Sequence, residues 1–374
     1  MPNTPRKAFP SDLPEGLKPR LRLFLSIDLV GSTAFKQSRQ AWLPALLDFY
    51  RDFDRIVHAH YRAFRQRSNA FVAPPEFWKS NGDELLYTCD LETRAQAVDA
   101  IRIWMSALSA YRSDLATLTD DLDVKSTAWI ALFPAPNSEV FFRRGGAQFR
   151  SDASENPILL QAEMRDQWYG GKTRHDIIRD FVGPSIDTGF RLSGWASPRR
   201  LVLSADLAFL LTSAYPVAEE PLPLHFSGAQ KLRGVVGDQP YPMIWLPVGA
   251  GEREDVGDAG IGRHLSDPVM LRSFCEAIIE QNYKVFTPFF LADAPDGDTD
   301  FGWAPPYIIT RIISDWHAEK RHRTAALGRP RSRIASGGRV DSRKASGQRR
   351  VWRRQIYSVS YGVGIVHVAS ESPQ

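Results

Sequence analysis

Cysteine is nearly absent from this chain of 374 residues. The two cysteines, Cys89 and Cys275, lie far apart and show no paired spacing. This argues against a disulfide framework or a zinc site built on cysteine, and it suits a reducing cytoplasm. No apolar run reaches a membrane-spanning length, and residues 1–20 lack the apolar centre of a secretory signal. We expect a cytoplasmic protein with no membrane partner.

Signatures of serine hydrolases and of histidine metal sites are also missing. No Gly-x-Ser-x-Gly elbow occurs, which argues against a Ser/His/Asp hydrolase. The eight histidines show no metal-ligand spacing beyond the weak pair His58 and His60, so core or surface positions suit them better. The hydrophobic content of 43% and charged content of 24% are those of a globular protein with ample core.

Acidic residues are scarce in one segment only. Residues 320–354 carry 13 Lys and Arg against one acid, Asp341, a net +12 that leaves −8 for the rest of a chain whose total is +4. Such a segment, with few apolar residues, is typical of a flexible tail. A nucleic-acid-binding arm is the alternative, but aromatic residues for base stacking are few, so we do not expect a nucleic-acid partner.

Apolar periodicity predicts an α+β fold with an antiparallel-rich sheet. The predicted order is strand 21–28, helix 40–66, hairpin 69–88, helix 91–115 and strand 122–133, which is the β-α-β-β-α-β order of the ferredoxin-like plan. An insertion at 134–172 precedes helix 183–196, strand 200–204, a short helix to about 213, and a hairpin at 225–247. We predict an arm at 1–20, a catalytic domain at 21–250, a helical extension at 251–319 and a tail at 320–374.

Two aspartates stand where apolar strand patterns end. Asp28 precedes a small turn that contains Gly31, and Asp83 follows Gly82 in the turn of the predicted hairpin. Two carboxylates beside a loop with free amides suit hard divalent cations and phosphate groups. The pair therefore points to phosphoryl or nucleotidyl chemistry.

A third element begins at Asp180 and Gly183. The helix predicted after them presents Asp187 and Arg191 four residues apart, on one face. An ordinary intrahelical ion pair is the alternative interpretation.

These three elements resemble the motifs of the class III nucleotide cyclases. The family pattern is an Asp-x-x-Gly strand end, a Lys-x-x-Gly-Asp hairpin, and an Asp-x-x-Gly helix start with Asn and Arg seven and eleven residues on. This chain matches it with Asp28 and Gly31, then Lys79 and Gly82-Asp83, then Asp180, Gly183, Asp187 and Arg191. The resemblance spans about residues 21–247 without the insertion, and it implies the ferredoxin-like cyclase fold.

The resemblance also implies a role for each residue. Asp28 and Asp83, with the Leu29 carbonyl, would hold two Mn²⁺ or Mg²⁺ ions per site, and the amides of Val30, Gly31, Ser32 and Thr33 would cradle the phosphates. Arg191 would neutralise charge on the α-phosphate. Asp187 replaces the usual Asn, and it would orient Arg191. Because the family divides each site between two chains, a homodimer is implied.

The identity of the base is a separate prediction. In adenylate cyclases the residues that match Lys79 and Asp180 read adenine. The segment 183–191, including Gly189 and Phe190, looks more like the pyrimidine cyclases of the bacterial Pycsar anti-phage system, whose product activates a separate effector protein.

A pair of side chains four residues apart is associated with pyrimidine selection in those enzymes. Two such pairs occur here, Arg51 with Arg55 and Tyr61 with Arg65, and Tyr50 could fill the space that a purine would need. We expect UTP as substrate, then CTP, then ATP. A degenerate cyclase domain that only senses nucleotides is the non-enzymatic alternative.

Overall fold

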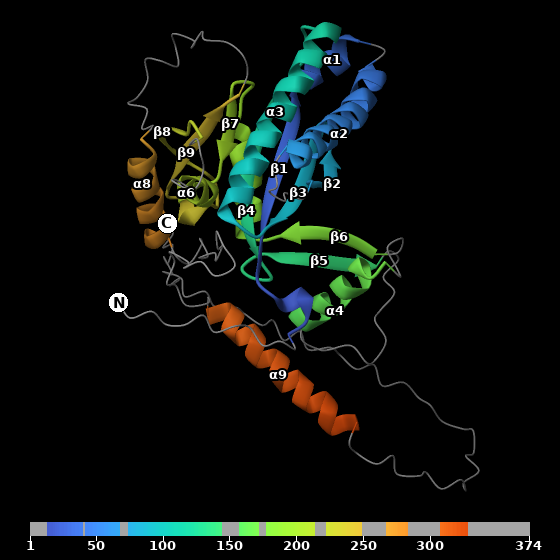
Figure 1. Cartoon of the computed structure of the whole chain (residues 1–374), viewed down its shortest axis with the longest axis vertical. Coiled ribbons are helices and arrows are strands. Elements are labelled where there is room, and N and C mark those ends of the chain that lie inside the picture. Colours follow the sequence, from blue (N-terminus) through green and yellow to red (C-terminus); the bar gives the residue numbers. More distant parts are fainter. Residues whose placement is uncertain are drawn as a thin grey trace, which may run out of the picture. The chain divides into compact units, whose positions relative to one another are not determined.

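The chain forms an α+β fold around a mostly antiparallel sheet in the computed structural model (Figure 1). The structure describes residues 13–39, 42–67, 74–143, 157–171, 177–213, 222–248, 267–282 and 307–327. Residues 1–12 of the predicted arm, residues 251–266 of the predicted helical extension and the tail beyond 327 lie outside these residues.

The main sheet has seven strands in the order β2-β3-β1-β4-β7-β9-β8. Only β4 and β7 run parallel, and the other neighbouring pairs are antiparallel. The strands are β1 (Arg20–Val30), β2 (Glu76–Asn81), β3 (Glu84–Leu91), β4 (Asp123–Phe133), β7 (Arg200–Leu203), β8 (His225–Lys231) and β9 (Pro240–Pro247). The order of the first four strands is that of the ferredoxin-like plan, so the predicted fold class is confirmed.

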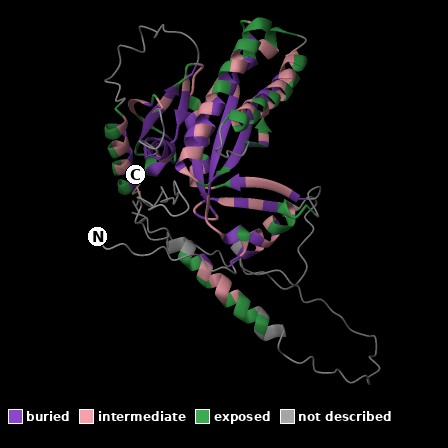
Figure 2. Ribbon diagram, in the orientation of Figure 1, coloured by how far each residue is buried: buried purple, intermediate pink, exposed green. Residues whose placement is uncertain are grey.

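Strand β1 is buried on both faces, although only one of its two alternating sets of side chains is apolar throughout and the other includes the buried polar residues Arg22 and Ser26. Leu23, Leu25 and Ile27 point into the main core, whereas Phe24 points into an aromatic cluster on the opposite face. Asp28 is on the same side of the strand as Phe24, by the period of two. Figure 2 shows β1 and the strands beside it, β3 and β4, as the most continuously buried part of the fold.

Two long helices, α2 (Trp42–Arg67) and α3 (Arg94–Leu118), supply the main core with apolar side chains. Thr93 and Gln96 form a capping box that fixes the start of α3. A short helix that sequence patterns missed, α1 (Ser32–Ser38), lies between β1 and α2. No helix in the described part of the chain is long and apolar enough to cross a membrane.

The predicted insertion contains regular structure. Strand β5 (Ser138–Arg143) pairs with β6 (Ile177–Val182) in a second, two-stranded antiparallel sheet, and helix α4 (Pro157–Tyr169) packs on β5. The next helix, α5 (Pro184–Leu192), ends earlier than predicted and continues only as a 3₁₀ turn, Ser193–Trp195.

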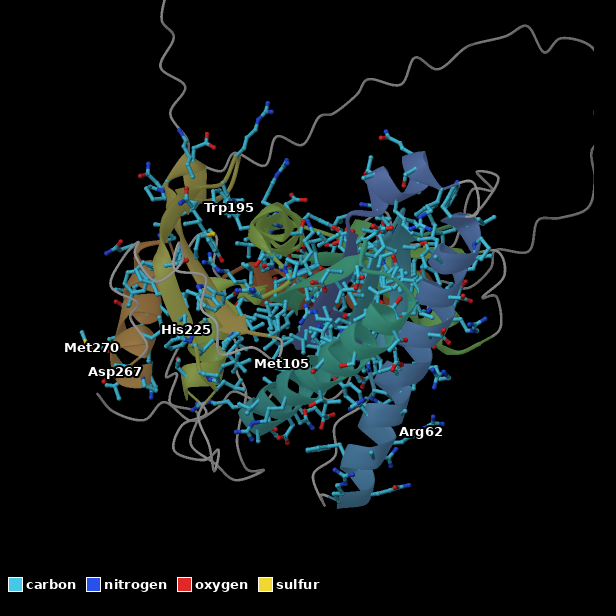
Figure 3. All side chains as sticks on the ribbon, turned by 90° about the horizontal axis from the view of Figure 1, so that it is seen from above. Arg62, Met105, Trp195, His225, Asp267 and Met270 are labelled. Carbon is cyan, nitrogen blue, oxygen red and sulfur yellow. The ribbon has the colours of Figure 1, made fainter. Side chains whose placement is uncertain are left out.

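The later elements cover the other end of the main sheet. Helix α6 (Ala205–Ser213) follows β7 as predicted, and α8 (Pro268–Gln281) packs against α6. Figure 3 shows α8, with Asp267 and Met270, at the opposite end of the sheet from Arg62 on α2. Two further 3₁₀ turns lie at Glu15–Leu17 and Val236–Asp238. The last described helix, α9 (Tyr307–Leu327), extends past the predicted start of the tail at residue 320.

Candidate functional site

Asp28 lies near the end of β1, directly opposite Glu84 of β3 and Lys125 of β4. The Lys125 Nζ lies 3.2 Å from its Oδ2. Burial raises the pKa of Asp28; Lys125 opposes this shift, and Asp83 adds to it. The carboxylate thus lies in a partly dry corner where a cation stabilises its charged form.

Asp83 comes to the same corner through the β2–β3 turn. Its carbonyl oxygen accepts a hydrogen bond from the Leu29 amide at 3.3 Å, which ties the turn to the end of β1. Its carboxylate accepts a hydrogen bond from the Ser32 hydroxyl and lies 3.6 Å from the Lys36 Nζ. The structure therefore brings the two predicted metal ligands to adjoining strands and gives each a lysine partner.

The loop after Asp28 requires glycine at one position. Gly31 has a φ of 84°, and a Cβ added to it would lie 2.5 Å from the carbonyl oxygen of Asp121. Gly31 in turn allows α1 to begin at Ser32, which is buried, and leaves Thr33 exposed. Val30 is the last residue of β1 and pairs with Asp123. The predicted phosphate loop is thus the tight junction between β1 and α1.

Three charged residues at this corner were missed by sequence reasoning: Lys36, which lies against Asp83, and also Glu84 and Lys125. Glu84 is buried beside Asp28, and burial, with the charge of Asp28, raises its pKa. Lys125 pairs with Asp28 from a neighbouring strand that lies far along the chain. Glu84 follows Asp83 directly and was visible in the motif, but only the strand register reveals that it faces Asp28.

The described residues contain no group of three or more His, Cys, Asp and Glu side chains that could hold a metal ion. The donors predicted here are two carboxylates and one backbone carbonyl, and all three are the hard oxygen ligands that Mg²⁺ and Mn²⁺ prefer. Lysine ammonium groups already lie against both carboxylates. The donors therefore fit divalent cations in type, and a bound cation would compete with the two ammonium groups for the carboxylates.

Lys79 and Asp180, the predicted base-reading pair, meet in the structure. Lys79 Nζ lies 2.9 Å from Asp180 Oδ1, although 101 residues separate the two in sequence. The indole of Trp78 and the amide of Phe181 donate to the same oxygen at 3.0 and 2.9 Å. Asp180 belongs to β6, and the following helix begins at Pro184, one residue after the predicted start at 183.

Helix α5 is held in place at its N-terminus by the predicted insertion. The side chain of Asn137, fully buried, accepts from the Ser185 amide at 3.0 Å and donates to the Ser185 hydroxyl at 3.1 Å. Gly183 has a φ of 140°, and a Cβ there would lie 2.5 Å from Asn137 Oδ1. Asn137 thus replaces the capping side chain that glycine cannot supply.

Asp187 and Arg191 are exposed on α5 and do not form the intrahelical ion pair that was the alternative interpretation of their spacing. Within the described part of the chain, neither side chain makes a hydrogen bond or an ion pair. The opposite side of α5 packs against β4, where Gly189 contacts the ring of Trp129 so closely that a Cβ would lie 2.2 Å from it. Phe190 packs on Trp78 and Trp129.

Several residues proposed for base selection lie elsewhere. The hydroxyl of Tyr50 donates to the carbonyl of Gly82, next to Asp83. Arg51 and Arg55 pair with acidic residues of their own helix, α2. Tyr61 is buried in the main core and is excluded from contact with a substrate there. Of these residues, only Tyr50 contacts the turn that carries Asp83.

Comparisons with known proteins gave structural similarities alone. No model of a protein family matches the chain, and no curated protein matches it. Similar solved structures include the adenylyl cyclase CyaB from P. aeruginosa, at 11% identity over 64% of this chain and 98% of that chain, with a TM-score of 0.42. The guanylyl cyclase Cya2 shares 14% identity over 64% and 96%, with a TM-score of 0.39. An adenylate/guanylate cyclase/hydrolase from Silicibacter pomeroyi shares 13% over 63% and 99%, with a TM-score of 0.36.

Proposed function

We propose that this chain is a nucleotide cyclase, which converts a nucleoside triphosphate to a 3′,5′-cyclic nucleotide and pyrophosphate. The observation that carries the proposal is the corner where Asp28 and Asp83 meet, each faced by a lysine. Such a corner offers oxygen ligands to two Mn²⁺ or Mg²⁺ ions, with the Leu29 carbonyl as a further ligand. When bound, the ions would activate the ribose 3′-hydroxyl and stabilise the leaving pyrophosphate.

The reaction forms one bond and breaks one bond at the α-phosphorus. The 3′-oxygen loses its proton to solvent and attacks phosphorus, and the bond to the bridging oxygen of pyrophosphate breaks. Arg191 would neutralise the negative charge that develops on the α-phosphate, a role that suits a permanently charged guanidinium. Its exposed side chain, with no ion pair among the described residues, supports this role. Asp187, one turn earlier, would contribute by orienting the Arg191 of an assembled site.

Lys79 and Asp180 are proposed to read the base. Uracil presents its N3–H to a carboxylate and a carbonyl oxygen to an ammonium, and cytosine and adenine present an amino group and a ring nitrogen. The pair is therefore compatible with UTP, CTP and ATP. The preference for UTP, with CTP and then ATP as alternatives, rests on the resemblance of segment 183–191. The role of Tyr50 in excluding purines rests on size, because a pyrimidine is smaller than a purine and Tyr50 would fill the remaining space.

A homodimer is part of the proposal. Asp28 and Asp83 of one chain would act with Arg191, Lys79 and Asp180 of a second copy, so each active site would need both chains. The cyclic nucleotide would then serve as a second messenger for a separate effector in anti-phage defence, as the resemblance suggests.

The deciding experiment supplies purified protein with ATP, GTP, CTP and UTP separately, with Mn²⁺, and identifies products by chromatography against authentic cyclic nucleotides. We expect cyclic UMP. Cyclic CMP or cyclic AMP would keep the cyclase proposal and correct the base, whereas no cyclic product from any nucleotide would favour a nucleotide-binding sensor.

Complementation tests the shared site. A chain with Asp83→Ala and a chain with Arg191→Ala should each be inactive, and a mixture should regain activity because one intact site forms in each heterodimer. If subunits exchange, as shown by mass spectrometry of the mixture, and activity stays absent, the shared site is wrong.

A further inference from the structure

The carboxylate of Asp180 is held by three donors that differ in mobility. Its Oδ1 accepts from Trp78 Nε1, Lys79 Nζ and the amide of Phe181, at 3.0, 2.9 and 2.9 Å. The amide belongs to β6 and cannot leave. The indole is nearly as fixed, because Trp78 is only 8% exposed and packs edge-on against Phe24 and Phe181. Lys79, by contrast, has a flexible and 37% exposed side chain.

Trp78 contacts both members of the base-reading pair. Its ring centroid lies 4.3 Å from Lys79 Nζ, a cation–π distance, while its N–H bonds Asp180. With three donors on Oδ1, the other oxygen of Asp180 makes no hydrogen bond to any described residue. It is therefore available to accept a hydrogen bond from a ligand at a carboxylate that is 36% exposed.

We propose that Trp78 is a positioning residue for base recognition, an inference that rests on the proposed function. When a base enters, Lys79 can turn from Asp180 to an acceptor on the base, since its ammonium rotates on a flexible stem. Trp78 and the Phe181 amide then keep the carboxylate in place, so that its free oxygen meets a donor on the base. The indole N–H thus keeps the Asp180 carboxylate in one position, both when Lys79 contacts it in the empty site and when Lys79 contacts the base in the occupied site.

The competing explanation is that the Trp78 N–H needs a partner merely because it is buried. A purely structural hydrogen bond would affect folding and every ligand alike. A positioning role would affect the base and spare the triphosphate. The two explanations therefore differ in which part of the substrate loses affinity.

The test compares Trp78→Phe, which keeps an aromatic ring in the cluster and removes the N–H, with Trp195→Phe at an exposed tryptophan. For the nucleotide that the wild type prefers, we expect KM to rise about tenfold or more in Trp78→Phe, the scale of a hydrogen bond to a charged group. We expect kcat to stay nearly constant, because binding energy common to the ground and transition states is lost. The inhibition constant of inorganic tripolyphosphate, which has no base, should not change. Trp195→Phe should behave as the wild type.

A double variant links the effect to Asp180. In an Asp180→Ala background, Trp78→Phe should raise KM no further, because the carboxylate that it positions is gone. The proposal is overturned if Trp78→Phe weakens nucleotide and tripolyphosphate equally, or if its effect is undiminished without Asp180. Should the wild type form no cyclic product, calorimetric binding of UTP and tripolyphosphate makes the same comparison, so this inference and the proposed reaction can fail separately. Thermal unfolding checks that each variant folds.

Discussion

The side of the site with Asp28 and Asp83 is built from neighbouring strands of the main sheet, whereas the side with Asp180 and Arg191 depends on residues 134–171. Asp28 lies near the end of β1, and Asp83 lies in the turn between β2 and β3. Strand β3 pairs with both β1 and β2. Within the described part of the chain, Asp180 lies on a strand that pairs with β5 alone, and the helix of Arg191 is capped by Asn137. The side with Asp28 and Asp83, the carboxylate side, is therefore formed by the ferredoxin-like core. The side with Asp180 and Arg191, the base side, also needs β5, β6 and α4, which we call the second scaffold.

That second scaffold is attached to the main sheet by a buried ionic cluster. Glu139 of β5 bonds Arg20 of β1, Arg165 and Tyr169 of α4, and lies 3.8 Å from Arg179 of β6. Burial alone would raise the pKa of Glu139, but the arginines, led by Arg20, lower it. Since Arg179 precedes Asp180 and also bonds Glu76 of β2, the cluster joins the two strands that carry the base-reading pair.

Removing one charge from the carboxylate side should have the largest effect. Asp28→Asn should lower turnover by at least about a hundredfold, the scale seen when one preorganised electrostatic group is lost. It should also unfold at the same or a higher temperature near neutral pH. The raised pKa of Asp28 means that its ionisation costs stability as pH rises through that pKa, and Asn removes this cost.

The matched control is Asp166→Asn, at an exposed position of α4, and it should keep full turnover. Normal turnover in Asp28→Asn, measured as cyclic product per minute, would contradict the metal role. A loss of turnover accompanied by unfolding would contradict the claim that this side of the site costs stability.

A methyl group added to Gly189 should damage the base side next. The new Cβ would lie 2.2 Å from the Trp129 ring, so α5 must shift and carry Arg191 with it. A displacement of about 1 Å can cost about a hundredfold in rate. Gly194→Ala, where a Cβ meets nothing within 4 Å, is the control. The double variant Gly189→Ala and Trp129→Leu should recover part of the rate, because the smaller side chain leaves room for the methyl group. If the double variant is folded and its turnover is no higher than that of Gly189→Ala, displacement of α5 is not the cause of the loss.

Glu139→Gln should lower the free energy of unfolding by weakening the cluster that supports the base side of the site. It leaves the partly buried Arg20 and Arg165 without the buried carboxylate that they share, which should cost up to about 3 kcal/mol in urea unfolding. The wild type's lowered pKa gives stability that is present above the unfolded-state pKa and is lost as pH falls through the folded-state pKa; the variant should lack this dependence. Glu92→Gln, exposed before α3, is the control.

The same variant should raise KM for nucleotide more than it raises the inhibition constant of tripolyphosphate, because the cluster supports Asp180 and not Asp28. Equal changes in the two constants would mean that the two sides of the site are not built independently.

The same division explains what sequence could predict. Strand β1, the hairpin and α3 follow from apolar periodicity, so Asp28 and Asp83 could be placed at neighbouring strand ends. Lys79 and Asp180 were paired only through a resemblance, since no local pattern relates residues so far apart. Asn137, Glu139 and Trp78 act through contacts across the fold, which periodicity does not encode. The ion pair between Asp187 and Arg191, the alternative interpretation of their spacing, does not form among the described residues, because helical spacing permits a contact but does not require one.

The smallest predicted effect concerns Lys125, which pairs with Asp28 from the neighbouring strand β4. In Lys125→Met the ammonium no longer competes with a divalent cation, so Mn²⁺ should bind up to about fivefold more tightly at neutral pH, the upper scale of a partly exposed ion pair. The pKa of Asp28 should also rise further, because Lys125 is the main group that opposes the effect of burial, with a smaller contribution from the Leu29 amide. Protons then compete with the metal at higher pH, and Mn²⁺ affinity should fall sooner as the solution is acidified. Electron paramagnetic resonance of free Mn²⁺, titrated against each protein without nucleotide, measures both changes. Weaker Mn²⁺ binding by Lys125→Met at neutral pH would instead mean that Lys125 organises the corner and does not merely balance its charge.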